Sequence, residues 1–302
     1  MTEPQDPSSA PPIERRANLP HEAFVRDYLM PWRPVILTDA TKHWTAIGTW
    51  TPEMFKNRYG ARDITIGDKT YNFGQFIDLV IGSTRENPSP YLRNQLLEEW
   101  LPELMPDVSP LPSCTEPNWL ESRLFPRKQT LTSIEIFIGG EGSEFPFLHY
   151  DNLHVHAFLS QIYGSKLFVV YPPDQTPYMY PRDGVHRNKS NVGDVENADL
   201  LKFPLFAKAN PTRFVLKPGE TLFVPAGWWH TTRMLGPSIT MSANTVNQSN
   251  WRQFSRDYVT NAGIHRPYLR PYLGALAAYL TIMGNVEYAR WRRRLARGGA
   301  PS

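Results

Sequence analysis

Hydrophobic and polar positions divide the chain into a mixed first part and a second part that is rich in short strands. Before residue 130 the apolar spacing predicts helices over residues 19–29, 51–60 and 72–82. Thr51 followed by Pro52, and Asn72, are suitable residues to begin the second and third of these helices. A fourth candidate over 96–105 contains Pro102, which must end or restart it. Residues 106–128 are Pro-rich and predict irregular structure.

After residue 130 the pattern changes to short β-rich runs separated by Gly- and Pro-containing turns. Many short strands at regular spacing predict a sandwich or a barrel. Residues 174–209 interrupt the series with a long, polar, Pro-containing stretch, which is typical of an insertion over the mouth of a barrel. After Trp251 helical spacing returns and continues to about residue 297. The predicted strands cover residues 131–138, 153–162, 166–171, 213–216, 221–224, 228–234 and 238–246.

The organisation expected from these patterns has four parts. Residues 1–12 are polar and rich in Pro and Ser, which predicts disorder. Residues 13–130 form a mixed α/β part that packs on the barrel. Residues 131–250 form the β-rich core with its insertion over 174–209, and 251–302 form a helical region with a basic tail.

Composition fits one large β-rich unit with a substantial core. The chain has 302 residues, and its 41% hydrophobic content and 15 Phe supply enough apolar surface to fill such a core. The single cysteine, Cys114, excludes an intramolecular disulfide framework and fits a reducing compartment. No leader of the secretory type opens the sequence, and the apolar run over 273–283 is shorter than a membrane span. We therefore expect a soluble, cytoplasmic protein with no membrane partner.

The formal net charge of +3 is concentrated in the last residues, so the body of the chain is near neutral. A near-neutral body disfavours a nucleic-acid partner, although a basic tail can touch RNA or anionic lipid. The residues that carry this charge are Arg290, Arg292, Arg293, Arg294 and Arg297, against Glu287.

His149, Asp151 and His230 are the residues that point most directly to chemistry. Residues two apart in a strand share a face, so His149 and Asp151 point the same way. Two imidazoles and one carboxylate on one face of a metal are the ligand set of non-haem Fe(II) oxygenases. The alternatives are that His149 and Asp151 lie on an exposed strand end, and that His230 is a histidine satisfied within the core. His154 and His156 also share a face, but strand parity directs them away from His149 and Asp151.

Lys166 precedes a nearly continuous apolar strand, residues 167–171. A lysine that leads into a buried strand needs an anion, or it must lose its charge. A dicarboxylate such as 2-oxoglutarate would supply that anion, with its keto acid end on the iron. The alternative is a turn that exposes Lys166 to solvent.

Three segments together resemble the JmjC, or cupin-like, Fe(II)/2-oxoglutarate oxygenases. They are His-Tyr-Asp at 149–151, the run at 161–173 that contains Lys166, and the run at 218–230 that ends in Ala-Gly-Trp-Trp-His. Within that family the protein hydroxylase branch is most similar, including the asparaginyl hydroxylase that acts on hypoxia-inducible factor. The resemblance is dense over residues 131–246 and thin before them.

The resemblance implies a mainly β fold, a double-stranded β-helix of the jelly-roll type, with helical additions at both ends. It implies that His149, Asp151 and His230 bind Fe(II), and that Lys166 and Tyr91 hold the distal carboxylate of 2-oxoglutarate. Asn244 would lie near the co-substrate or a metal-bound water. Tyr91 and Asn244 also have plain explanations, as an exposed loop residue and a strand-end amide. The family pattern has a Thr shortly before the first ligand, whereas residues 144–148 carry no hydroxyl here.

The activity that the resemblance implies is hydroxylation of a C–H bond with O₂, and the expected substrate is a protein or peptide side chain. The alternatives are N-methyl-lysine demethylation, tRNA base hydroxylation, and hydroxylation of a small molecule or peptide natural product. A catalytically silent cupin-like metal-binding protein is the alternative from a different class. The C-terminal helices carry an apolar stripe, Leu273, Leu276, Leu280 and Met283, which predicts a homodimer or packing on the chain's own barrel.

Overall fold

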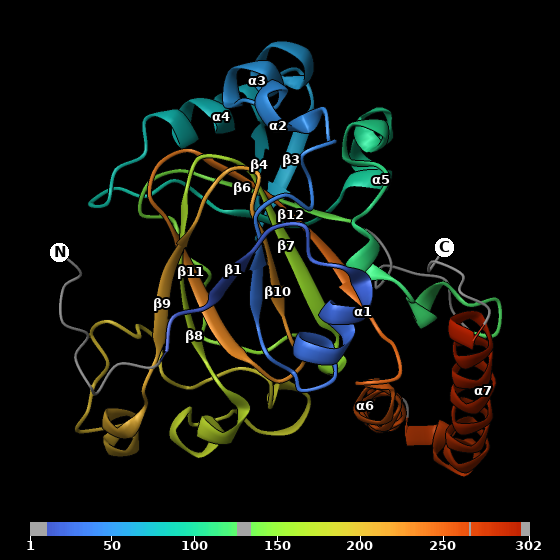
Figure 1. Cartoon of the computed structure of the whole chain (residues 1–302). Coiled ribbons are helices and arrows are strands. Elements are labelled where there is room, and N and C mark those ends of the chain that lie inside the picture. The colour runs from blue at the N-terminus through green and yellow to red at the C-terminus, as the bar shows by residue number, and fades with distance from the viewer. Residues whose placement is uncertain (1–10, 126–133, 266, 297–302) are drawn as a thin grey trace, which may run out of the picture.

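Two β-sheets face each other and form the core of the molecule (Figure 1). The computed structural model describes residues 11–125, 134–265 and 267–296. The larger sheet has seven strands in the order β1-β2-β10-β7-β12-β6-β5, and the smaller has three in the order β11-β8-β9. This arrangement, with its flanking helices, confirms the predicted mainly β, jelly-roll fold.

The larger sheet is assembled from strands that are distant in sequence, and all its neighbours pair antiparallel except β1 and β2. Its central strand is β7, and the neighbouring β12 pairs with β7 on one side and β6 on the other. The seven strands are β1 (Glu14–Arg16), β2 (Val35–Leu37), β5 (Leu92–Leu96), β6 (Glu135–Gly139), β7 (His156–Tyr163), β10 (Thr221–Val224) and β12 (Ser238–Thr245).

The smaller sheet has β8 at its centre, paired antiparallel with both neighbours. Its register places His230 opposite Val170 and Met234 opposite Lys166. The three strands are β8 (Lys166–Tyr171), β9 (Thr212–Leu216) and β11 (Trp229–Met234).

Helices of the first part cover the outer face of the larger sheet. Ile136 and Ile138 of β6 and Met241 of β12 pack there against aromatic residues of the helical part. The expected helix starts are confirmed: the Thr51 side chain accepts a hydrogen bond from the Met54 N–H, and Asn72 accepts one from Gln75. The elements of this part are α1 (His21–Phe24), the π-helical turn Val25–Leu29, α2 (Ala46–Thr49), α3 (Pro52–Tyr59), the hairpin β3 (Asp63–Ile66) and β4 (Lys69–Asn72), α4 (Phe73–Ile81), α5 (Leu97–Trp100) and the 3₁₀ helix Pro102–Val108.

The structure corrects the prediction of one continuous strand over residues 153–162. A 3₁₀ turn, Asn152–His154, follows Asp151, and β7 begins only at His156. Leu153 and His154 both have positive φ, a conformation that strands do not allow. The side chain of Asn250 holds the turn by donating to the His154 carbonyl. The other predicted strands agree with the structure within a few residues, apart from residues 131–133, which lie outside the described residues.

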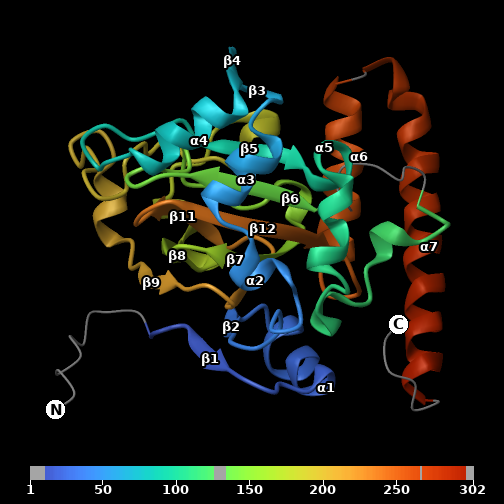
Figure 2. The same ribbon diagram turned by 90° about the horizontal axis from the view of Figure 1, so that it is seen from above.

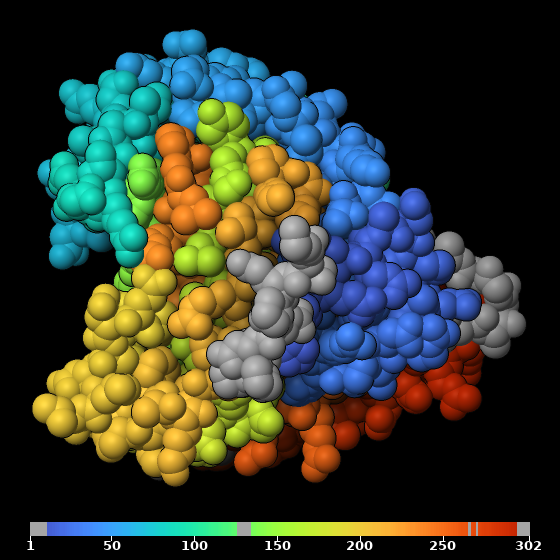
Figure 3. Space-filling model, turned by 60° about the vertical axis from the view of Figure 1, so that its left-hand side comes forward, coloured from blue at the N-terminus to red at the C-terminus, as the bar shows by residue number. Residues whose placement is uncertain are grey.

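The insertion between β8 and β9 has no strand of its own among the elements described. It contains the 3₁₀ helices Pro173–Tyr178, Gly184–His186 and Pro204–Lys208. Figure 3 shows the insertion, in yellow, covering one part of the surface beside the strands in green and orange.

Two helices, α6 (Trp251–His265) and α7 (Arg270–Ala296), follow the last strand and lie side by side along the molecule (Figure 2). Leu280 and Met283 of α7 are buried against Trp251 and Phe254 of α6, so the apolar stripe packs at least in part on the chain itself. None of the helices described has the length and apolar character needed to cross a membrane. The ends of the chain, 1–10 and 297–302, where disorder and part of the basic tail are predicted, lie outside the described residues.

Candidate metal and co-substrate site

A pocket of about 420 Å³ lies between the two sheets. Its walls follow strand parity, because alternate residues of each strand point inward. On β6 and β12 the residues that alternate with the inward ones, such as Ile136 and Met241, pack instead against the helices on the outer face of the sheet. The insertion closes part of the pocket with Val185, His186, Asn188 and Lys189. The inward residues of the strands are Glu135 and Phe137 (β6), Ala157 and Leu159 (β7), Lys166 and Phe168 (β8), His230 and Thr232 (β11), and Ser242 and Asn244 (β12).

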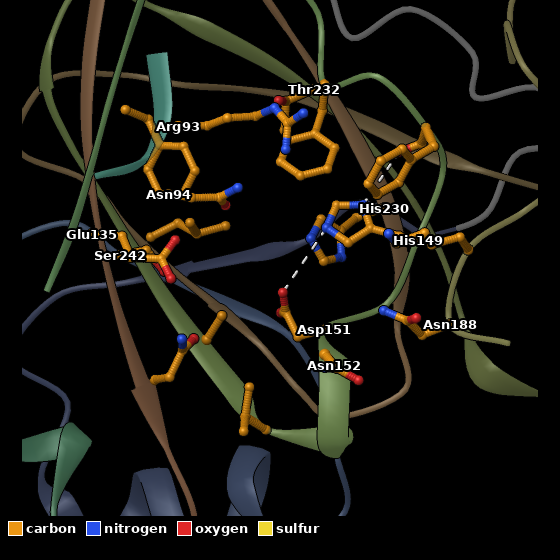
Figure 4. A pocket seen from close by; sticks show the side chains of 18 of the residues that line it. Arg93, Asn94, Glu135, His149, Asp151, Asn152, Asn188, His230, Thr232 and Ser242 are labelled. Carbon is orange, nitrogen blue, oxygen red and sulfur yellow. Dashed lines mark hydrogen bonds and ion pairs between the residues drawn. The ribbon is translucent and has the colours of Figure 1, made fainter. Parts of the chain in front are cut away.

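His149, Asp151 and His230 converge at one end of this pocket. One ligand atom from each lies within 4.8 Å of the other two. His149 Nε2 is 4.0 Å from Asp151 Oδ1, and Figure 4 shows the three side chains turned toward one another. The two histidines are 8% and 4% exposed, so the group is screened from solvent. The sequence prediction that these three residues come together is therefore confirmed in geometry.

Backbone contacts orient both imidazoles. His149 and His230 pair as an antiparallel bridge, with His149 N–H donating to the His230 carbonyl at 3.0 Å and His230 N–H donating back at 2.6 Å. His149 Nδ1 lies 3.3 Å from the Phe147 carbonyl and His230 Nδ1 lies 3.0 Å from the Trp228 carbonyl. A carbonyl can only accept, so each Nδ1 carries the proton and each Nε2 presents a lone pair. Metal-binding histidines are commonly fixed in this way.

The electrostatics of the group suit a cation. Burial, with the neighbouring His230, holds the pKa of His149 well below its ordinary value, so the imidazole stays neutral. Burial raises the pKa of Asp151, and His230 opposes that rise. A buried carboxylate beside two imidazoles gains its counter-charge when a divalent ion binds. The donor set therefore fits Fe(II), which imidazole and carboxylate ligands hold in a facial arrangement.

Lys166 is buried in the same pocket without an anion. It is 2% exposed, and burial lowers the pKa of its ammonium to about 7. Its Nζ lies 3.5 Å from the Tyr91 hydroxyl and over the rings of Tyr91 and Phe137. No carboxylate of the residues described forms an ion pair with it. The alternative of an exposed turn lysine is excluded, and the cation is available to an anionic ligand.

The structure brings the other predicted residues to the pocket as well. Tyr91 lines it, and burial raises the pKa of its phenol, so the hydroxyl keeps its proton and can donate. Asn244 also lines it, from β12. Ser143, the nearest hydroxyl before the first histidine, instead hydrogen-bonds to Ser89 and does not line the pocket.

His154 and His156 lie outside the metal group, as parity predicted, although the turn after Asp151 rather than a continuous strand sets their directions. His154 Nδ1 pairs with Asp257 of α6 at 2.7 Å. His156 is held between the Ala226 N–H and the Ser249 hydroxyl. Both histidines tie the core to neighbouring segments.

Sequence reasoning missed several polar residues of the pocket. Glu135 and Ser242 lie on the wall opposite the histidines, and Arg93 reaches in from β5 (Figure 4). Burial and the nearby Asp151 raise the pKa of Glu135 to about 7. Thr232 lines the pocket from the strand of His230. Strand parity counted from His230 could have identified Thr232 as a pocket residue. The positions of Glu135 and Arg93 in the pocket follow only from which strands pair in the sheet, which the sequence does not show.

Two imidazoles and a carboxylate at the end of a pocket between two sheets define a facial-triad metal site in a cupin-type fold. Comparison with known proteins agrees with this class. A family model described as the cupin-like domain matches residues 20–256. Lysine-specific demethylase 8 of Xenopus tropicalis is 30% identical over 232 residues, which cover 73% of this chain and 50% of that protein. Lysine-specific demethylase JMJ21 of Arabidopsis thaliana is 29% identical over 252 residues, 79% of this chain and 26% of that protein. HSPB1-associated protein 1 of Rattus norvegicus is 33% identical over 126 residues, which cover 41% of this chain and 25% of that protein.

The chain belongs to the cupin-like domain family. The group of His149, Asp151 and His230 fits the cofactors of JmjC oxygenases, which are Fe(II), 2-oxoglutarate and O₂. The chain spans about half the length of the Xenopus relative. The narrower resemblance to the asparaginyl hydroxylase stays a prediction.

Proposed function

We propose that this protein is an Fe(II)- and 2-oxoglutarate-dependent oxygenase that hydroxylates a C–H bond on a protein or peptide side chain. The observation that carries the proposal is the presence, in one pocket, of a three-ligand metal group and a buried lysine without an anion. Lys166 has no counter-charge among the residues described, so its ammonium is available to an anionic ligand that reaches the metal group.

The roles of the residues follow from their positions. His149, Asp151 and His230 would hold the metal, and three ligands leave positions free for other molecules. When bound, Fe(II) with 2-oxoglutarate and O₂ oxidises the C–H bond to C–OH, while 2-oxoglutarate becomes succinate and CO₂. Lys166 would pair with the distal carboxylate of 2-oxoglutarate and Tyr91 would donate its hydroxyl to it. The protein's own task is to orient these groups and to exclude water.

The region around the pocket supports a side chain of a peptide as the substrate. Phe145 stacks on the ring of His149, with ring centroids 4.2 Å apart, and Phe147 packs edge-on against both. Lys189 of the insertion lies over Phe147. An aromatic wall beside the metal, bordered by the insertion, can enclose an extended chain while one side chain enters the pocket. Asn244 would lie near the co-substrate.

N-methyl-lysine demethylation is the second candidate, and Glu135 favours it. Its carboxylate lines the pocket wall across from the histidines and forms no ion pair among the residues described. A partly buried carboxylate of this kind can accept a cationic group such as a substituted ammonium. The two demethylase-named relatives support the same reading. The two reactions share the oxidation step, and in demethylation the hydroxylated methyl group leaves as formaldehyde.

Substrate capture tests the proposal and separates the two reactions. Protein loaded with Mn(II) and an unreactive 2-oxoglutarate analogue is used to capture peptides, which are then incubated with Fe(II)-loaded protein, 2-oxoglutarate and O₂. Mass spectrometry should find a product one oxygen atom heavier for hydroxylation, or one methylene group lighter with formaldehyde for demethylation. The Asp151→Ala variant should give neither product. If neither product forms and no succinate is released with any substrate, the silent metal-binding alternative is supported instead.

A further inference from the structure

Three positive side chains gather around the two phenylalanines beside the metal group. The Arg93 guanidinium lies 5.6 Å from the centre of the Phe145 ring. The Lys189 ammonium and the Arg182 guanidinium lie 4.7 Å and 5.8 Å from the centre of the Phe147 ring. Arg93, Lys189 and both rings line the pocket, and Figure 4 shows the Arg93 side chain extending into it. We call Arg93, Arg182 and Lys189 the basic cluster.

Backbone contacts fix the two members of the basic cluster that belong to the insertion. Lys189 pairs with His149 as an isolated antiparallel bridge. The Ser190 N–H donates to the Leu148 carbonyl at 2.8 Å, and the Arg182 N–H donates to the Lys189 carbonyl at 2.8 Å. Arg182 Nε also donates to the Ser190 carbonyl, at 3.1 Å. The insertion therefore holds these positive charges in place beside the first metal ligand.

No carboxylate of the described residues forms an ion pair with the basic cluster. Glu135 and Asp151 line the pocket without pairing with it. The members of the cluster also repel one another: burial lowers the pKa of Lys189, and the charges of Arg182 and Arg93 lower it further. Like charges that are held close together without a partner attract anions, so the cluster favours an anionic ligand.

The aromatic rings favour an acidic peptide over a nucleic acid as that ligand. Single-stranded nucleic acids bind basic surfaces by stacking their bases on aromatic side chains. Here Phe145 is already stacked on His149, with an angle of 14° between the rings, and cations lie over both phenylalanines. Carboxylates need no ring face, because they pair directly with guanidinium and ammonium groups.

The basic cluster also lies close to the position of the residue that is oxidised. The centres of the Phe147 and His149 rings are 5.4 Å apart, and the Lys189 ammonium lies over the same Phe147 ring. Because an extended chain advances about 3.5 Å per residue, an acidic residue within about three positions of the target residue can reach the cluster.

We propose that the basic cluster binds acidic residues, Asp or Glu, that flank the target residue in the substrate peptide. The proposal rests on the proposed function, because it concerns the substrate of that site. It adds a sequence preference that neither the metal group nor the co-substrate sets.

Peptide binding without turnover tests this preference. Three pools of fluorescein-labelled peptides share a randomised central residue and carry flanks rich in Glu, in Gln or in Lys. Their dissociation constants are measured by fluorescence anisotropy on protein loaded with Mn(II) and an unreactive 2-oxoglutarate analogue. The Glu pool should bind at least about tenfold more tightly than the Gln pool in about 50 mM salt, and the Lys pool should bind most weakly. The difference should shrink in about 500 mM salt, because salt screens charges at the surface.

Variants connect the preference to the basic cluster. Arg93→Gln and Lys189→Met should each weaken binding of the Glu pool about three- to tenfold and leave binding of the Gln pool within about twofold. Lys189→Glu reverses the charge and should weaken binding of the Glu pool further than Lys189→Met does. Arg252→Gln is the matched control, because Arg252 is an exposed arginine of α6 that does not line the pocket. It should leave all the constants unchanged.

Three other results would each overturn a different statement. If the wild type neither releases succinate nor binds the 2-oxoglutarate analogue, the proposed function fails. If the wild type releases succinate but binds the Glu pool no more tightly than the Gln pool, or if Arg93→Gln and Lys189→Met behave as Arg252→Gln does, only the acidic preference fails. If a single-stranded RNA dodecamer binds more tightly than the Glu pool and Lys189→Met weakens its binding, the cluster belongs to a nucleic-acid site, and the proposal is wrong.

Discussion

Replacing Lys166 by methionine should make the metal-free protein more stable while removing its affinity for 2-oxoglutarate. The pKa of this lysine falls from 10.5 to about 7 on burial. A difference of that size corresponds to an upper limit of about 5 kcal/mol for keeping the ammonium charged in the folded protein. Methionine fills a similar volume without a charge, so the variant avoids this cost.

The pH dependence gives the sharper measurement. Because the folded-state pKa of Lys166 lies below the unfolded one, the unfolded chain binds more protons between them. The free energy of unfolding of the wild type should therefore rise with pH in this window. Between about pH 7.5 and about pH 9 the rise relative to Lys166→Met should be about 2 kcal/mol. Urea unfolding in the presence of a chelator measures this difference at each pH.

An exposed lysine provides the control. Lys208→Met should change with pH as the wild type does, because Lys208 lies in solvent. Loss of the charge pair should also weaken 2-oxoglutarate binding to Mn(II)-loaded Lys166→Met by about a hundredfold. Equal pH slopes for the wild type and Lys166→Met would refute the reasoning, because they would mean that Lys166 is already neutralised by an acidic partner.

Three further changes have defined outcomes. The raised pKa of Glu135 makes the folded protein bind a proton more tightly than the unfolded chain, so the free energy of unfolding of the wild type should rise by about 2 kcal/mol as pH falls from about 8 to about 5.5. Glu135→Gln should lack this rise in urea unfolding. Equal profiles for the two proteins would show that the pKa of Glu135 is not raised by folding. Asp257 forms ion pairs with Arg187 of the insertion and with His154, so Asp257→Asn should lower the free energy of unfolding by about 3 kcal/mol. Thermal and urea unfolding measure this change. A change under about 0.5 kcal/mol would mean that these ion pairs behave as solvent-exposed ones. Ile282 is 62% exposed on α7 and belongs to the face available for the proposed homodimer. Light scattering should give twice the monomer mass for the wild type and the monomer mass for Ile282→Glu. A wild type that is monomeric at micromolar concentration would refute the dimer.

The sequence predicted most of the fold because its elements carry local signals. Thr51 and Asn72 cap their helices through their own side chains, which a short window of sequence contains. The strand after Asp151 was predicted too long because the apolar run of β7 extends back through Leu153. The positive φ values of Leu153 and His154 depend on contacts with Asn250, about a hundred residues away.

The site could be predicted where its residues share a strand or a motif. His149 and Asp151 lie two residues apart, and Lys166 directly precedes an apolar strand. Glu135 and Arg93 carry no such signal, because they enter the pocket only through the pairing of β5 with β6 and of β6 with β12. Neighbours in a sheet that are distant in the chain cannot be read from local periodicity.

Succinate release tests the central claim most directly, since it needs the metal group and the co-substrate but no identified substrate. Purified protein with Fe(II), ascorbate and 2-oxoglutarate should release succinate slowly. Asp151→Ala should release none above the background without enzyme, and Asp68→Ala, which changes an exposed acid away from the pocket, should match the wild type. Succinate release by Asp151→Ala at the wild-type rate, or none from the wild type, would contradict the account.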